Sequence, residues 1–370
     1  MTLSPRVDPP DWLVLREGRA PRWGGEIRRH HIFTRLAERT GARILEGGWS
    51  DREIRRVTLG PIASIVPSAL ARRVRRSGRP RFAASEKLRE PVLRTAIEIT
   101  DPAVVAIYDD PVAQARTLGV WMEPGWTDML AQRQRANCDA FRWHAVPTAS
   151  FAVLAGLDPN RVIVGGNGTD TRAVRVGPWP DRPTIGVVSA AAPGRGLELL
   201  VESARLARWD LPELELRLWL VATSDATQGY LDGLRASLAA DSWIRIATAA
   251  YDDLGETLGQ ASALAIAHPP GEYMDVALPV KLFDSLAAGR PLVVTPRIET
   301  ATIVNRFAVG VVASGDAASD LAASIVGLLS DVDRTRAIGE RARAVAESEF
   351  DWRIVGDRIA DEVLRRESSA

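Results

Sequence analysis

The chain has 370 residues, of which 46% are hydrophobic and 25% are charged, as in a globular protein that is long enough for two domains. Its single cysteine, Cys138, excludes an intrachain disulfide and suits a reducing compartment. No apolar run approaches the ~18 residues that a membrane-spanning helix needs, and the apolar stretch at Trp12–Leu15 is too short for a signal peptide. These features predict a cytoplasmic protein.

The charges cancel overall but are unevenly distributed along the chain. Residues 1–170 carry 26 basic and 19 acidic side chains, whereas residues 171–370 carry 21 and 28. This asymmetry predicts that the first half faces something anionic. The densest basic run, Arg72–Arg81, could lie on an anionic membrane surface, or it could be an ordinary solvated loop or helix face. Nucleic acid is not expected as a partner, because the net charge is zero and no recognised nucleic-acid motif is present.

Short apolar runs alternate with helical patterns, which is typical of βα units and parallel sheets. In the first half we expect strands at Trp12–Leu15, Arg43–Leu45, Val104–Tyr108 and Phe141–Val146, a helix at Ile27–Arg39, and a helical segment over 111–140 that is broken at Pro124-Gly125. In the second half we expect strands at Thr184–Ser189, Leu214–Ala222, Trp243–Thr248, Ala263–Ala267, Leu292–Thr295 and Gly310–Val312. The helices expected there are Gly196–Arg208, Gln228–Ala240, Asp253–Gln260, Val280–Ala288, Asp320–Leu329, Arg334–Ser348 and Trp352–Arg366. Three prolines within residues 166–183 predict a connector between two domains.

Lysine is almost absent: of the 47 basic side chains only Lys87 and Lys281 are lysines. A compact ammonium suits a narrow approach to a phosphate better than a planar guanidinium does. Pro279 predicts a helix start that places Lys281 in the first turn, with Asp284 one turn further on the same face. A phosphate at Lys281 and a pair of ribose hydroxyls at Asp284 would fit this spacing. The competing interpretation is an exposed Lys–Asp ion pair at i,i+3.

Two glycine-containing turns follow expected strands, each before a helix. Gly24-Gly25 follows the first strand, where the backbone could approach a ligand and the helix N-terminus could bind an anion. Arg195, next to Gly196, follows the strand at Thr184–Ser189 and could donate two hydrogen bonds to a diphosphate. The alternatives are an ordinary βα turn and a solvated arginine.

Other sites have weaker support. Tyr108-Asp109-Asp110 ends an expected strand and could contact an acceptor or cap a helix. The four histidines show no metal-ligand spacing with cysteine or carboxylates, and no nucleophile motif is present. No metal site is expected.

Taken in order, these motifs resemble the retaining glycosyltransferases of the GT-B fold, especially family four. The segments that carry the resemblance are Gly24-Gly25, Ser150-Phe151, Asn167-Gly168-Thr169-Asp170, Arg195-Gly196, Asp284 to Val293, and Phe350-Asp351-Trp352.

The resemblance implies an α/β protein with two Rossmann-like domains facing across a cleft. Residues 1–170 would form the acceptor domain, residues 171–350 the nucleotide-sugar donor domain, and residues 351–370 a helix that packs back on the first. The implied reaction moves a sugar from a nucleotide-diphosphate donor, UDP- or GDP-linked, to a carbohydrate or lipid-linked acceptor with retention of configuration. No further cofactor is implied, and a lipid-linked acceptor would place the protein at the inner face of the membrane.

The resemblance also implies roles for single residues. Arg195 and Lys281 would stabilise the departing diphosphate, Asp284 would bind the ribose, and Gly25 would let the first domain close over the donor. The family commonly has a glutamate eight positions before the Asp284 position, where this chain has Val276, so Glu272 and Asp275 are the nearby acidic candidates. The arginine that often follows the first strand of the donor domain is also missing, with Ser189 in that region. A sugar-nucleotide epimerase and a catalytically inactive binding subunit stay open as alternatives.

Overall fold

The structure is a computed structural model that describes residues 11–16, 24–46, 54, 79–118, 125–248 and 253–369. The chain divides into two compact units, each with one six-stranded parallel sheet. The first unit comprises Met1–Val112, Glu123–Gly166 and Val355–Ala370, and the second comprises Ala113–Met122 and Asn167–Ile354.

The sheet of the first unit has the strand order β2-β1-β3-β4-β5-β6. Its strands are β1 (Trp12–Arg16), β2 (Arg43–Glu46), β3 (Arg81–Ser85), β4 (Asp101–Ala106), β5 (Trp143–Val146) and β6 (Val162–Val164). The helical elements are α1 (Gly24–Thr40), α4 (Glu90–Ile99), α6 (Trp126–Ala140), α7 (Ala149–Leu154) and the short 3-10 turn η2 (Pro159–Arg161). Leu13, Phe82 and Phe141 are fully buried in its core.

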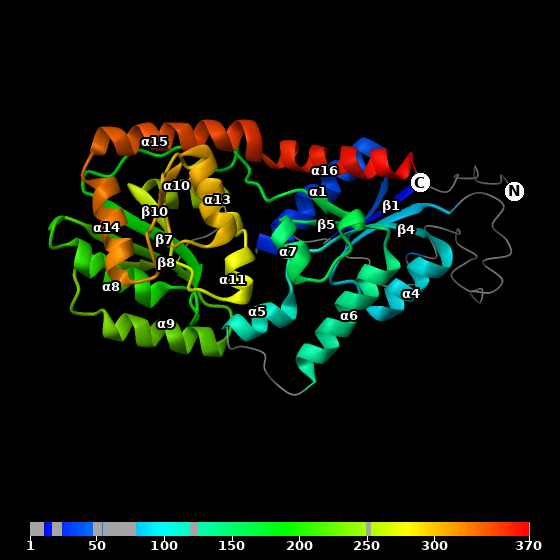
Figure 1. The fold of residues 1–370 in the computed structure, drawn as a ribbon, viewed down its shortest axis with the longest axis horizontal. Helices are drawn as coiled ribbons and strands as arrows, with labels where there is room; N and C mark the ends of the chain where they lie inside the picture. Colours follow the sequence, from blue (N-terminus) through cyan, green and yellow to red (C-terminus); the bar gives the residue numbers. More distant parts are fainter. Residues whose placement is uncertain are drawn as a thin grey trace, which may run out of the picture. The chain divides into compact units, whose positions relative to one another are not determined.

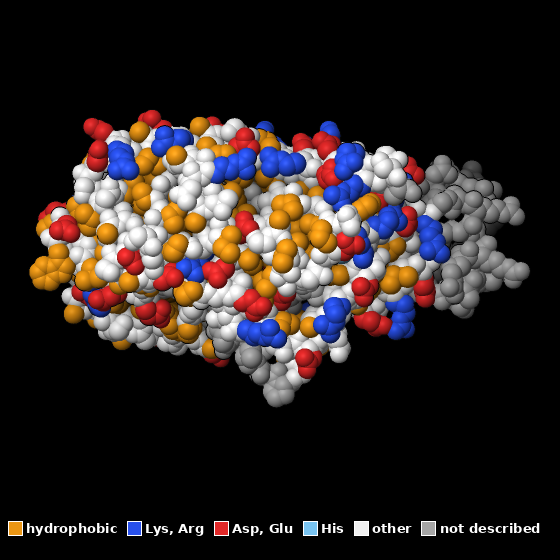
Figure 2. Space-filling model, in the orientation of Figure 1, with side chains coloured by type: hydrophobic (Ala, Val, Ile, Leu, Met, Phe, Trp, Pro, Cys, Tyr) orange, Lys and Arg blue, Asp and Glu red, His pale blue; other side chains and the backbone are white. Residues whose placement is uncertain are grey.

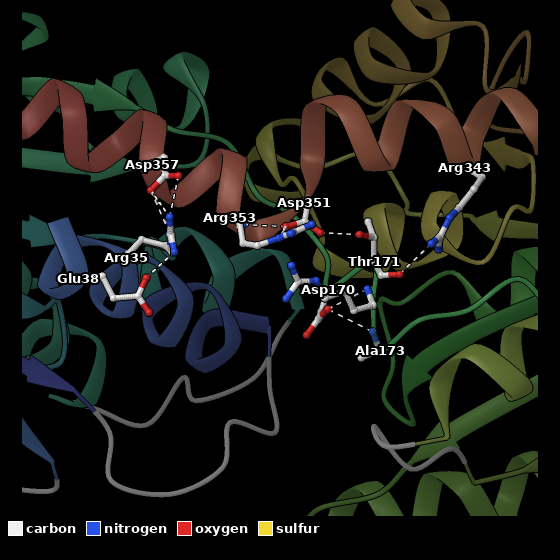
Figure 3. Close-up of polar contacts among 10 residues, drawn as sticks. Arg35, Glu38, Asp170, Thr171, Ala173, Arg343, Asp351, Arg353 and Asp357 are labelled. Carbon is white, nitrogen blue, oxygen red and sulfur yellow. Dashed lines mark hydrogen bonds and ion pairs between the residues drawn. The ribbon is translucent and has the colours of Figure 1, made fainter.

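The end of the chain belongs to the first unit, although its last helix, α16 (Trp352–Glu367), begins in the second. Nε and Nη2 of Arg35 in α1 donate to the Asp357 carboxylate, Nε to Oδ1 at 3.0 Å and Nη2 to both oxygens at 2.8 Å (Figure 3). A Cβ on Gly356 would lie 2.5 Å from Cγ of Arg35, so this position needs glycine.

Only part of the basic run expected at Arg72–Arg81 falls within the described residues. Arg72, Arg73, Arg75 and Arg76 lie outside them, so the predicted membrane contact stays a prediction. Arg81 does not form a free basic surface, since its Nε donates to the buried Glu367 at 2.8 Å. Burial alone would raise the pKa of Glu367, but hydrogen bonds from Arg142, Trp143 and Arg81 hold that pKa below its ordinary value.

The sheet of the second unit has the strand order β12-β11-β10-β7-β8-β9. Its strands are β7 (Thr184–Ala190), β8 (Glu215–Val221), β9 (Ile244–Ala247), β10 (Ala263–Ile266), β11 (Leu292–Val294) and β12 (Gly310–Val312). The helices are α8 (Leu197–Ala207), α9 (Asp225–Ser237), α10 (Leu254–Gly259), α11 (Glu272–Val276), α12 (Val280–Ala287), α13 (Ile298–Phe307), α14 (Ala318–Leu329), α15 (Val332–Val345) and the π-helical turn η3 (Ala346–Phe350). Helix α5 (Pro111–Leu118) crosses from the first unit into the second.

Two apolar clusters cover the two faces of this second sheet. Side chains from α8, α9 and α14 pack on one face, and side chains from α10, α12, α13 and α15 pack on the other, with β7, β8 and β10 drawn between the two sets (Figure 1). Leu216 and Leu218 point to the first cluster while Trp219 points to the second, as the alternation along β8 requires. A parallel sheet with both faces covered is the α/β arrangement expected from the sequence.

Most expected elements are confirmed within a few residues, and some elements were missed. β3, β6, α4, α7, α11 and α13 were not predicted, β4 begins at Asp101 rather than Val104, and α1 begins at Gly24 rather than Ile27. β3 has two alanines and a serine, which have low strand propensity, but its position between β1 and β4 buries Phe82, Ala83 and Ala84 completely.

Charged side chains of both signs are interspersed over the face of the second unit that Figure 2 shows. In the described part of the chain, no helix is both long enough and apolar enough to cross a lipid bilayer.

Candidate functional site

Three nitrogen-bearing side chains of the second unit come together where its strands end. Arg195 lies in the turn after β7, His268 lies two residues after the end of β10, and Lys281 is in the first turn of α12. Their charges act on one another, since Arg195 and Lys281 both lower the pKa of His268, and Arg195 lowers that of Lys281. The carboxyl edge of an open parallel sheet is where such folds bind ligands.

The turn Gly194-Arg195-Gly196 holds Arg195 at this edge. Both glycines have a positive φ, +73° and +74°. A Cβ on Gly196 would lie 1.6 Å from the carbonyl oxygen of Ala267, so the turn packs directly on the chain that leaves β10. Gly196 is also the N-cap of α8 and supplies no side-chain cap to the N–H groups of that helix. Nε of Arg195 is buried without a hydrogen-bond partner in the structure.

Lys281 is the second residue of α12, because Pro279 is the N-cap of this helix rather than its first residue. Among the described residues, its ammonium group has no hydrogen-bond or ion-pair partner. Burial and the charge of Arg195 lower the pKa of Lys281 to about 7. The site therefore holds two cations, Arg195 and Lys281, without an acidic partner for the lysine.

Asp284 does not pair with Lys281, so the alternative of an exposed Lys–Asp ion pair is wrong. Its side chain is buried, and Oδ1 accepts a hydrogen bond from the Thr169 hydroxyl at 2.8 Å. Burial raises the pKa of Asp284 to about 7, although the Thr169 hydrogen bond opposes this shift. Thr169 belongs to the segment in which the chain enters the second unit.

This entry segment is fixed to the C-terminal segment of the same unit. Thr169 and Asp351 form a parallel bridge in which the Thr169 amide donates to the Phe350 carbonyl, and the Trp352 amide donates to the Thr169 carbonyl, both at 2.9 Å. The Asp351 carboxylate accepts hydrogen bonds from the Thr171 hydroxyl and, at 2.7 Å, from Nε of Arg353 (Figure 3).

Arg343 connects the entry segment to the end of α12. It donates to the carbonyl oxygens of Thr171 at 2.8 Å, Val174 at 2.7 Å and Ala287 at 2.6 Å. Asp284 and Ala287 both lie in α12, the helix that carries Lys281. The entry segment therefore holds this helix at its middle, through Thr169, and at its end, through the hydrogen bonds of Arg343.

The two acidic candidates near Val276 have different surroundings. The Asp275 carboxylate lies 2.7 Å from Nη1 of Arg297. The Glu272 side chain is about half exposed, and its carboxylate lies 3.9 Å from Nη1 of Arg116. Glu272 is therefore the more accessible of the two, and no contact joins it to Arg195 or Lys281 in the described part of the chain.

The sequence predicts that His268-Pro269-Pro270 follows a strand and shapes the donor loop, but does not place His268 among the residues that bind the donor. Its ring is buried, and Nδ1 has no hydrogen-bond partner in the structure. Burial and the charges of Lys281, Arg195 and Arg297 push the pKa of His268 well below its ordinary value, so the ring is neutral. The sequence could show that His268 comes just after a buried strand, but only the fold shows which residues surround it.

Gly24 and Gly25 belong to the first unit, where they are the first two residues of α1. A Cβ on Gly25 would lie 3.0 Å from both Nη1 of Arg29 and Cδ1 of Tyr108, so glycine allows the first turn of α1 to approach Tyr108 closely. The described residues include no group of three or more His, Cys, Asp or Glu side chains that could hold a metal ion.

Comparison with solved structures identifies the class of fold. A sucrose-phosphate synthase from Thermosynechococcus elongatus matches with 11% identity over 97% of this chain and 99% of that chain, with a TM-score of 0.66. HepE from Anabaena, solved in complex with UDP-glucose, matches with 14% identity over 97% and 99%, with a TM-score of 0.64. A glycosyltransferase from Rickettsia africae matches with 11% identity over 96% and 99%, with a TM-score of 0.61. Together with the two parallel sheets, these similarities define the GT-B fold.

A family match falls within the second unit. Residues 182–331 match the family described as glycosyl transferases group 1. No curated protein matches the sequence. The family match covers less than half of the chain, so it shows a likeness of the second unit to group 1 glycosyltransferases.

Proposed function

We propose that the protein transfers a sugar from a nucleotide-diphosphate donor to a carbohydrate or lipid-linked acceptor, with retention at the anomeric carbon. The observation that carries the proposal is the pair Arg195 and Lys281, which repel each other at the strand ends of the second unit. Two cations held together in a partly buried site repel each other. An anion that binds between them offsets this repulsion and is stabilised by both charges. The similar HepE was solved with UDP-glucose, which favours a UDP-linked donor, and a GDP-linked donor is the alternative.

In this proposal Arg195 and Lys281 act on the leaving diphosphate. Negative charge grows on the phosphate oxygens as the bond to the sugar breaks, and fixed cations stabilise that charge most in the transition state. The uncapped N-terminus of α8 adds N–H groups that favour an anion. Arg195 supplies a planar fork for two phosphate oxygens, and Lys281 a compact charge.

Asp284 would bind the ribose hydroxyls of the nucleotide. Its Oδ1 is engaged by Thr169, which leaves Oδ2 to accept hydrogen bonds from a diol. Glu272 is proposed as the carboxylate that contacts the transferred sugar, since Arg297 neutralises Asp275.

The remaining parts of the proposal concern the acceptor. Residues 1–170 would hold it, residues 171–350 would hold the donor, and residues 351–370 would brace the first domain. Gly24 and Gly25 would allow the first domain to approach the donor phosphates. A lipid-linked acceptor would bring Arg72–Arg81 against an anionic membrane surface.

The test follows the release of nucleoside diphosphate from a panel of UDP- and GDP-sugars, with and without simple glycosides as acceptors. The wild type should release the diphosphate from one donor, and Lys281→Met should lower the rate by at least about tenfold, as expected when a charge that stabilises the transition state is removed. Lys87→Met is the matched control, because Lys87 is the only other lysine and is exposed in the first unit. Conversion to another sugar nucleotide without release would favour an epimerase, and binding without release would favour an inactive subunit.

A further inference from the structure

His268 has no role in the proposed chemistry, yet the fold fixes it firmly at the carboxyl edge of the second sheet. The residue is only 2% exposed. Its carbonyl oxygen accepts a hydrogen bond at 2.7 Å from the buried Thr295 hydroxyl, and the same hydroxyl lies 3.3 Å from the Ile266 carbonyl oxygen. Because Thr295 directly follows β11, the neighbouring strand holds the segment that carries the ring.

The same segment packs on the turn that carries Arg195. A Cβ on Gly196 would lie 1.6 Å from the Ala267 carbonyl oxygen and 3.3 Å from the Ala267 Cβ, so the two backbones are in direct contact. Arg195 and His268 are the sequence neighbours of these two touching residues. Gly196 is also the N-cap of α8, whose first N–H groups have no side-chain cap. His268 therefore lies beside two of the proposed phosphate-binding elements.

The fold gives the His268 ring no hydrogen bond. Nδ1 is buried without a partner, and no described residue bonds to the other ring nitrogen. His144 in the first unit is equally buried and also has an unpartnered Nδ1, but its Nε2 lies 2.9 Å from the Cys138 carbonyl oxygen. A buried polar group without a partner costs stability, so it calls for an explanation outside the fold.

We propose that His268 is a third binding group for the donor diphosphate, donating a ring N–H to a phosphate oxygen. This inference rests on the proposed function and adds a residue to the same site. The diphosphate supplies the hydrogen-bond partner that the described residues do not.

A neutral donor suits this position. Burial and the charges of Lys281, Arg195 and Arg297 hold the pKa of His268 well below its ordinary value, so the ring carries one N–H and no charge. A third cation would add to the repulsion between Arg195 and Lys281 in the empty site, whereas a neutral N–H adds none. A hydrogen bond to a charged phosphate oxygen is also stronger than one between two neutral groups.

His268→Leu tests the proposal, because leucine fills a similar space without a polar atom. Titration calorimetry on the full chain should show Kd values for UDP and UDP-glucose that rise by a similar factor, about ten- to a hundredfold. The free variant should unfold at or above the wild-type midpoint, because no hydrogen bond of the fold is lost. His144→Leu is the matched control, which should unfold below the wild-type midpoint and keep the wild-type affinity.

Two amide variants separate the hydrogen bond from the shape of the side chain. His268→Asn and His268→Gln each keep a side-chain N–H, near one or the other ring nitrogen. At least one of them should bind UDP severalfold more tightly than His268→Leu does. If both bind as weakly as His268→Leu, the ring does not act as a hydrogen-bond donor and the inference is wrong, whatever the stability of the leucine variant.

Other outcomes would also overturn the inference. Unchanged affinity in His268→Leu would show that the ring does not contact the ligand, and a loss confined to UDP-glucose would place the ring against the sugar instead of the diphosphate. If the wild type binds GDP rather than UDP, GDP and GDP-mannose replace the uridine probes. A wild type that binds neither nucleotide defeats the proposed function and the inference with it, whereas binding that is equal in the wild type and His268→Leu defeats the inference alone.

Discussion

The Thr169 hydroxyl donates to Oδ1 of Asp284 at 2.8 Å, and this hydrogen bond joins the entry of the chain into the second unit to the helix that carries Lys281. Both side chains are buried, so removing one would leave the other without this hydrogen bond and without water to replace it. The bond thereby holds α12 in the position that places Lys281 beside Arg195.

Thr169→Val should destabilise the second unit by about 1–3 kcal/mol, because it leaves a buried carboxyl group without its hydrogen-bond donor. The change should also weaken nucleotide binding if the position of α12 matters. Chemical denaturation measures the first effect, and titration calorimetry the second. Thr302→Val is the control, since the exposed Thr302 bonds only to a carbonyl of its own helix, at Ile298. Equal stability of the two variants would refute the structural role of Thr169.

The raised pKa of Asp284 predicts a stability that falls with pH. Its folded pKa of about 7 exceeds its ordinary value of 3.8, so the folded state binds more protons between these values and loses stability as the pH rises through them. Asp284→Asn cannot titrate, and its stability relative to the wild type should improve by up to about 2–3 kcal/mol between pH 5 and pH 7. Denaturation of both proteins at the two pH values tests this, and a constant difference would contradict it.

Asp351 should show the opposite dependence. Burial alone would raise its pKa, but hydrogen bonds from Arg353 and Thr171 lower it to about 2. Its contribution to stability is therefore present above its ordinary pKa of 3.8 and is lost as the pH falls towards 2. Asp351→Asn should cost about 2 kcal/mol at pH 7 and clearly less at pH 3. A cost that stays equal at both pH values would show that the Asp351 charge is unimportant.

Gly196→Ala should disrupt the turn that holds Arg195. The new Cβ would lie 1.6 Å from the Ala267 carbonyl oxygen, and φ of +74° disfavours any side chain. Loss of nucleotide binding, with lower stability, is the expected result. Gly229→Ala in α9 is the control, because nothing lies within 4 Å of its Cβ position and alanine should stabilise that helix by up to about 1 kcal/mol. Wild-type binding by Gly196→Ala would show that the turn is not as tightly packed as described.

Sequence reasoning proposed the basic residues of the candidate site but not the residues that contact them. Arg195 and Lys281 could be expected because each lies at a recognisable junction, one after a strand and one at a helix start. The Thr169–Asp284 bond joins residues 115 positions apart, and no local pattern predicts such a pair. His268 could be placed in a loop after a strand, but the residues around it could not be predicted, since they come from the turn after β7, from α12 and from Arg297.

The fold shows a similar division. The strands rich in valine, leucine and isoleucine were predicted, as at β7 and β8. The alanine-rich β3 was not, because its place in the sheet is decided by burial between β1 and β4 rather than by its own propensity.

The central claim is that the second unit binds a nucleoside diphosphate through Arg195 and Lys281, and thermal denaturation with UDP, GDP, ADP and TDP tests it most directly. One nucleotide should raise the midpoint of the wild type, by the equivalent of about 2.7 kcal/mol at a hundred times its Kd. Lys281→Met should lose most of this shift, and Lys87→Met should keep it. A midpoint that no nucleotide raises, or a shift of the same size in Lys281→Met, would contradict the claim.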